Sequence, residues 1–131
     1  MSWIKKSDDS FKATNKLIKD SLYNTSIHCS YYSCIQLALF IINESFGITL
    51  DEIDYETSSK GSHNWIINKL SVKLSDIKDR RSARTFSGNL NELKRLRVIA
   101  DYKQDYISEE TAIEVRQSSF EINKFLKETF F

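Results

Sequence analysis

Arg97 stands out among the residues that could do chemistry, because a charge takes the place of the apolar side chain that its helical pattern requires. Leu93 and Ala100 occupy the same side of the predicted helix. Asp101 follows one turn later, close enough for an ion pair, and the Tyr102 hydroxyl can join the same network. A guanidinium stabilises charge that builds on phosphate oxygens, so a site for phosphate chemistry is one interpretation. A structural ion pair at the edge of a helical bundle is the other.

Two adjacent tyrosines, Tyr31 and Tyr32, lie in the most apolar stretch of the sequence. Their side chains point about 100° apart on a helix, so at most one is expected to face the core centrally while the other reaches a groove. Packing in the hydrophobic core is one explanation for both tyrosine side chains. In the functional interpretation, one hydroxyl joins Arg97, Asp101 and His63 in a polar pocket between three helices.

The two histidines, His28 and His63, are not accompanied by the spaced carboxylates or thiolates that a metal site needs. We therefore expect no metal ion and no cofactor, and surface or helix-capping roles for both side chains. His63 has a second possibility, because folding could bring it near Arg97, where His63 or Asp101 would act as a base.

Basic residues recur between positions 78 and 95, which makes this segment a candidate phosphate-binding surface. They are Lys78, Arg80, Arg81, Arg84, Lys94 and Arg95. The surface requires that both parts of the segment share one face. Otherwise the run is a solvated helix exterior, whose charge is diluted by Asp76 and Asp79.

The composition indicates one globular domain over residues 1–131, since 40% of the residues are hydrophobic and 28% are charged. A net charge of +1 gives no general attraction to nucleic acid or to anionic membranes, so any RNA contact must be local. No apolar run approaches the length of a membrane span, and the first residues lack the apolar region of a signal peptide. We expect a cytoplasmic protein without membrane contact, in which Cys29 and Cys34 are reduced.

Proline is absent and glycine occurs three times, which favours long helices. Apolar residues at helical spacing predict an all-α, up-and-down antiparallel bundle of four to five helices. The expected helices run from Ser7 to about Tyr23, from a cap at Asn24 or Thr25 to Gly47, from a cap at Ser62 to about Leu74, from Gly88 to about Gln104, and from Ser108 onward. The acidic segment from Ile48 to Lys60 is expected to be mostly loop.

The last helix carries more apolar residues than one stripe can bury, which indicates a docked C-terminal tail or a dimer contact. They are Ile113, Phe120, Phe125, Phe130 and Phe131.

Three short motifs resemble the HEPN superfamily of nucleotide-binding and ribonuclease-related helical bundles, in particular its short stand-alone bacterial members. The first is the run from Ser26 to Cys34 with its paired tyrosines, and the second is Gly61-Ser62-His63 at a helix start. The third is Arg97-Val98-Ile99-Ala100-Asp101-Tyr102, which is similar to an Arg-x-x-Ala-Asp-Tyr signature. The resemblance that these motifs carry, by their order and spacing, extends over nearly the whole chain.

The resemblance implies a homodimer that partners a minimal nucleotidyltransferase in a bacterial toxin-antitoxin or antiviral defence module. Catalytic members are metal-independent ribonucleases with a histidine four to six residues after an arginine, and no histidine follows Arg97 at that spacing. A ribonuclease with a divergent site is therefore the first alternative, and a non-catalytic structural adaptor is the second. The candidate catalytic residues are Arg97, Asp101 and His63, and the candidate binding residues are Tyr31, Tyr32, Ser62 and Tyr102. Some members are neutralised by adenylation of a tyrosine, which gives Tyr102 a further possible role.

Overall fold

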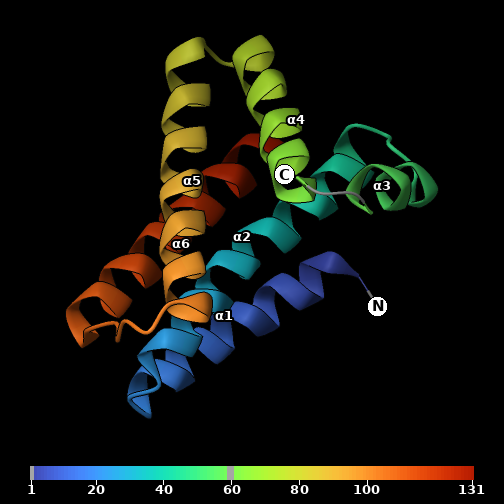
Figure 1. Cartoon of the computed structure of the whole chain (residues 1–131). Helices are drawn as coiled ribbons and strands as arrows, with labels where there is room; N and C mark the ends of the chain where they lie inside the picture. Colours follow the sequence, from blue (N-terminus) through green and yellow to red (C-terminus); the bar gives the residue numbers. More distant parts are fainter. Residues whose placement is uncertain (1, 59–60) are drawn as a thin grey trace.

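The computed structural model describes residues 2–58 and 61–131, and over these residues the chain forms six helices and no strand (Figure 1). The helices are α1 (Trp3–Lys19), α2 (Tyr23–Ser45), α3 (Leu50–Thr57), α4 (Ser62–Ile77), α5 (Arg80–Tyr102) and α6 (Glu109–Phe130). The predicted all-α class is therefore confirmed.

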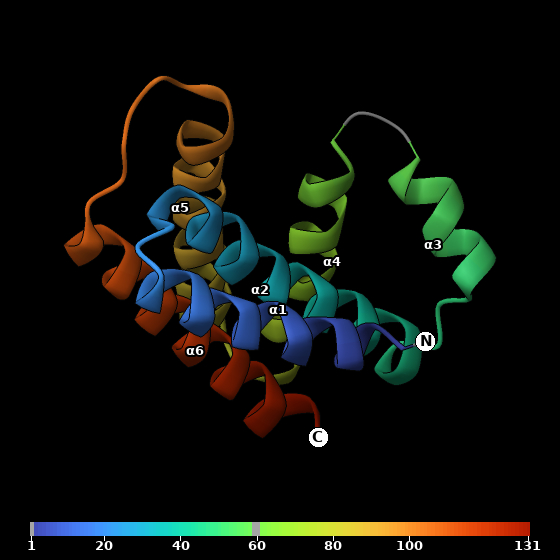
Figure 2. The same cartoon turned by 90° about the horizontal axis from the view of Figure 1, so that it is seen from below.

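The centre of the fold is α2, as its apolar residues on several sides predict. Its most deeply buried side chains include Ile27, Tyr31, Leu37 and Ile41. Helices α1 and α6 flank it, and the hairpin of α4 and α5 crosses this layer (Figures 1 and 2). By length and composition alone α2 could span a membrane, but most of its apolar stretch is buried, as in the core helix of a bundle.

Helix α6 runs parallel to α2, which departs from the expected up-and-down antiparallel arrangement. Near its start, α2 meets the start of α6, where the Tyr23 hydroxyl donates to Glu109 at 2.9 Å. Near its end, α2 meets the end of α6, where the rings of Phe46 and Phe130 lie 5.6 Å apart. The α4–α5 hairpin comes between α2 and α6 in the chain and crosses them steeply (Figure 1). Successive helices therefore do not simply alternate in direction, and α6 can run parallel to α2.

Helix α1 does run antiparallel to α2. Its Ser7 hydroxyl donates to the carbonyl of Ser33, and further along α1 the buried Thr14 accepts from Ser30 on the preceding turn of α2. Small hydroxyl side chains at these positions let the two backbones approach closely while their polar groups stay paired.

Three parts of the helical structure differ from the expectation for physical reasons that are visible locally. Helix α1 begins at Trp3 and not at Ser7, because Ser2 caps it by accepting from the amide of Lys5. The Ile48 to Lys60 segment was expected to be mostly loop, which is wrong for α3. Thr49 caps this helix by accepting from the amide of Glu52, and its hydroxyl also donates to the carboxylate of Glu52. Helix α5 begins eight residues before Gly88, where Asp79 accepts from the amide of Ser82 at 2.6 Å.

The apolar excess on α6 is partly absorbed within the chain. The ring of Phe131 packs on Phe40, and that of Phe130 packs on Phe46. The C-terminal segment thus contacts α2, but Phe131 stays 62% exposed, more than Phe120 at 49% and Ile113 at 42%.

Candidate functional site

Helices α2, α4 and α5 bring six side chains together in what we term the Arg97 cluster. Its members are His28, Tyr31 and Tyr32 from α2, His63 from α4, and Arg97 and Asp101 from α5. The α2 residues follow each other at i, i+3 and i+4, so they share one face of that helix. Arg97 and Asp101 stand four residues apart on α5, so they also share one face of their helix.

Arg97 lies at the centre of the cluster and is only 8% exposed. Its guanidinium carbon lies 5.4 Å from the ring centre of Tyr31, 5.7 Å from that of Tyr32 and 5.9 Å from that of Tyr102. The nearest carboxylate oxygen, on Asp101, is 3.7 Å away, too far for a hydrogen bond.

The hydrogen-bonding capacity of this guanidinium is largely unused. Its Nε is buried without a hydrogen-bond partner among the described residues. A buried donor without a partner is costly, and a guanidinium presents its donors in a fork that fits a phosphate. Arg97 is therefore held by aromatic faces and by the charge of Asp101, and not by hydrogen bonds.

Asp101 also holds His28, a pairing that the sequence did not predict. The imidazole Nδ1 lies 2.8 Å from a carboxylate oxygen of Asp101, and the ring stacks on Tyr32 at 4.5 Å between centres. With Nδ1 held by the carboxylate, Nε2 is the nitrogen left to exchange a proton with a ligand. The side chain of His28 is 43% exposed, so solvent and ligands can reach it.

His63 contacts the other side of the tyrosine pair. Its Nδ1 lies 2.9 Å from the Tyr31 hydroxyl, with donor and acceptor roles set by the histidine tautomer. Burial raises the pKa of Tyr31 far above its ordinary value, so this side chain stays a neutral phenol. Burial, and then the nearby charges of Arg97 and Lys94, lower the pKa of His63 below 6.5. The imidazole of His63 is consequently neutral at neutral pH, as a proton acceptor must be.

The backbone at the start of α4 places His63 in the cluster. Gly61 precedes the helix with a φ of 87°, a left-handed conformation that glycine adopts without the steric cost of a Cβ. The predicted capping role of Ser62 is wrong, because Gly61 occupies the cap position and Ser62 is the first helical residue. In the described part of the chain, none of the polar contacts within the cluster involves Ser62.

Asn24 fixes the other end of the cluster. Its amide donates to the carbonyls of Ala100 at 3.1 Å and Asp105 at 3.0 Å, and its oxygen accepts from the amide of Ile107 at 2.9 Å. The predicted capping role of Asn24 or Thr25 is therefore wrong, since the α2 cap position falls on Leu22. Asn24 instead ties the end of α5 and the following loop to α2.

The candidate residues of the sequence analysis mostly converge. Arg97, Asp101, His63, Tyr31 and Tyr32 meet, with Tyr31 buried and Tyr32 half-buried. Tyr102 borders the cluster but is 73% exposed. His28 was missed, although its spacing from the two tyrosines along α2 was a signal for a shared face.

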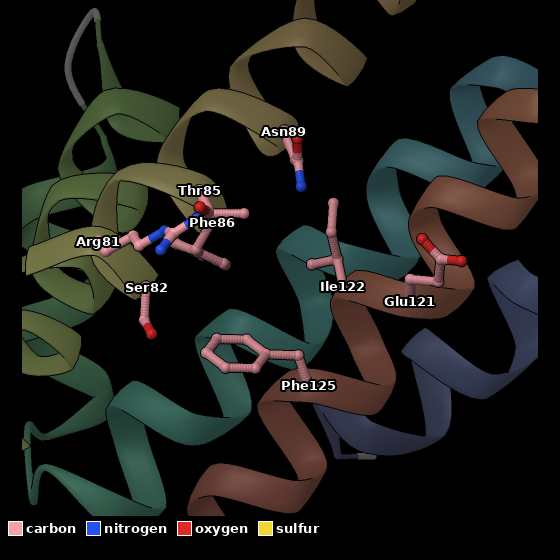
Figure 3. Close-up of a pocket in the computed structure, with 8 residues that line it drawn as sticks. All are labelled: Arg81, Ser82, Thr85, Phe86, Asn89, Glu121, Ile122 and Phe125. Carbon is pink, nitrogen blue, oxygen red and sulfur yellow. The ribbon is translucent and has the colours of Figure 1, made fainter. Parts of the chain in front are cut away.

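A crevice of about 320 Å³ lies between α5 and α6, apart from the Arg97 cluster (Figure 3). Apolar side chains, including Phe125, form part of its lining, and Arg81 and Glu121 are its charged groups. Glu121 accepts from the side-chain amide of Gln117. Neither histidine of the chain lines this crevice, so the Arg97 cluster is the better candidate for acid–base chemistry.

Comparison of the chain with protein-family models, with curated proteins and with solved structures finds no significant match. The function must therefore be argued from the chemistry of the Arg97 cluster itself.

Proposed function

We propose that this chain is a HEPN-like protein that cleaves RNA without a metal ion at the Arg97 cluster. The observation that carries the proposal is a buried guanidinium, with an unpartnered Nε, that packs on the tyrosine pair contacted by both histidines. The histidines come from α2 and α4, so they supply the groups that the local sequence after Arg97 lacks.

The cluster contains the groups that such a reaction needs. His63, neutral at neutral pH, takes the proton of an RNA 2′-hydroxyl, and the 2′-oxygen forms a bond to phosphorus. The bond from phosphorus to the 5′-oxygen breaks, and that oxygen takes a proton from the imidazolium of His28. The guanidinium of Arg97 stabilises the charge on the non-bridging oxygens. The products are a 2′,3′-cyclic phosphate and a 5′-hydroxyl.

The wider role follows from the resemblance to HEPN proteins. We propose a cytoplasmic component of a bacterial toxin-antitoxin or antiviral defence module, acting as a homodimer. The exposed apolar side chains of Ile113 and Phe120 on α6 support a contact with a second copy. Arg97, Asp101 and His63 are the expected catalytic residues, joined here by His28.

The direct test is incubation of the purified protein with unstructured RNA in excess chelator. We expect fragments that end in 2′,3′-cyclic phosphate, and no cleavage of an RNA whose 2′-hydroxyls are all methylated, because the nucleophile is then blocked. The products can be identified by mass spectrometry. Cleavage that survives methylation, or no cleavage of either RNA, would contradict the proposal.

A second function, as partner of a minimal nucleotidyltransferase, is favoured by the exposure of Tyr102. Its ring lies beside the Arg97 guanidinium, which would attract the phosphates of an incoming nucleotide. Co-expression with such an enzyme is expected to add adenylate to Tyr102 and to abolish cleavage. Intact mass measurement of wild type, Tyr102→Phe and the control Tyr106→Phe, whose ring is even more exposed, tests this. Equal labelling of wild type and Tyr102→Phe would exclude the assignment.

A third function, the non-catalytic structural adaptor, requires that the cluster serves only helix packing. The unpartnered Nε of Arg97 favours a working site, because a purely structural pair would pair its donors.

A further inference from the structure

The exposed side of α5 forms a basic ridge, which we define as Arg80, Arg84, Lys94 and Arg95. These residues fall within a narrow sector of the helix, away from the buried stripe of Phe86, Leu90 and Leu93. Four of the six predicted basic residues therefore share one side of α5, whereas Lys78 lies outside the helix, over the ring of Phe125, and Arg81 lines the crevice between α5 and α6.

Charge is strongly segregated onto this helix. The 23 residues of α5 carry six basic and two acidic side chains, a net charge of +4, whereas the whole chain has +1. The residues outside α5 therefore sum to −3. A concentration of positive charge on one element of a nearly neutral protein is the electrostatic signature of a polyanion site.

The first residue of the ridge does not stabilise α5. Arg80 and Arg81 occupy the first two helical positions, where positive charge opposes the helix dipole. Among the described residues, Arg95 pairs with Glu92 and Lys94 donates to the side chain of Asn64, whereas Arg80 and Arg84 form no ion pair. These two arginines therefore keep their charge free for a ligand.

Exposed aromatic rings lie at the cluster end of the ridge. Tyr102 closes α5, and Tyr106 in the following loop is 96% exposed. Next to a basic surface such rings suit the stacking of unpaired bases, which duplexes do not offer.

We infer that single-stranded RNA lies along the outer face of α5, with its phosphates on the basic ridge and its bases against Tyr102 and Tyr106. This rests on the proposed function, because the strand delivers its scissile phosphate to Arg97. The outer face of α5, from Arg80 to Tyr102, is about 33 Å long at the usual rise of a helix, which is enough for several nucleotides.

The test measures binding of a short 2′-O-methyl oligoribonucleotide, which cannot be cleaved, by fluorescence anisotropy over a range of salt concentrations. The double variant Arg80→Ala/Arg84→Ala is expected to bind roughly tenfold more weakly, and its salt dependence to fall by about 1.4 in log–log slope. The control Lys12→Ala/Lys16→Ala removes the same charge from exposed sites on α1 and should leave both values unchanged.

Tyr106→Ala should weaken binding at least about fivefold without changing the salt slope, whereas Tyr106→Phe should bind like wild type, because stacking needs the ring alone. Equal effects of the α1 and α5 double variants, or equal binding of duplex and single strand, would overturn the inference. Since the probe is uncleavable, ridge-dependent binding without cleavage of natural RNA would refute the proposed function alone.

Discussion

Replacing Arg97 by methionine is expected to reduce RNA cleavage by about 10²–10³-fold, the loss typical of removing one donor that stabilises a charged transition state. The fold should survive. Methionine has a similar length, packs against the tyrosine rings and removes a buried donor that has no partner among the described residues. The free energy of unfolding should therefore stay unchanged or increase.

Two measurements on the same variant separate the functions proposed above. Initial rates with an unstructured RNA report the site, and denaturant unfolding reports stability. Lost cleavage with full stability supports a working site, whereas lost stability with retained cleavage supports a structural adaptor. Arg97→Lys serves as a matched control that keeps the charge without the planar fork, and it should recover only part of the rate.

Replacing His63 by alanine is expected to lower kcat by about 10²–10⁴-fold, the usual contribution of a positioned base. The pH dependence carries a further signature. Burial, then Arg97 and then Lys94 lower the pKa of His63 below 6.5, so its neutral form persists into more acidic solution than that of a free imidazole. The decline of kcat/KM on the acid side should consequently lie below pH 6.5.

Variants of its neighbours test whether His63 is the group that titrates. Lys94→Met removes one of the two charges that lower this pKa, so the acid-side decline should move up toward pH 6.5. His28→Gln removes the proposed acid, so it should lower the rate but leave the acid-side decline in place. A decline that starts above pH 6.5 in wild type, or one unaffected by Lys94→Met, would contradict this role.

Local sequence signals account for much of the helical structure and fail where the signal is short. Ser108 caps α6 as expected, through its contact with the amide of Thr111. The start of α5 was missed because its first turns lie in a segment dense in charged residues. There the N-cap Asp79 and the few apolar residues, Ala83 and Phe86, do not give a clear helical period.

The site could be predicted only in part, because sequence spacing describes one helix at a time. The pairing of Arg97 with Asp101 at i+4 was expected, and the structure places them 3.7 Å apart. The contact of His28 with the same carboxylate joins residues 73 positions apart, and no local pattern encodes such a distance. His28 therefore entered the site only through packing.

By itself the sequence determined that the chain is helical, since proline is absent and apolar residues recur at helical spacing. It also determined which residues share a helical face, including the tyrosine pair of α2 and the charged pair of α5. Only the tertiary structure decided which faces meet, that α6 runs parallel to α2, and that both histidines contact the tyrosine pair on which Arg97 packs. The physical reason is that periodicity fixes the direction of a side chain about its own helix axis, whereas its partner depends on how whole helices pack.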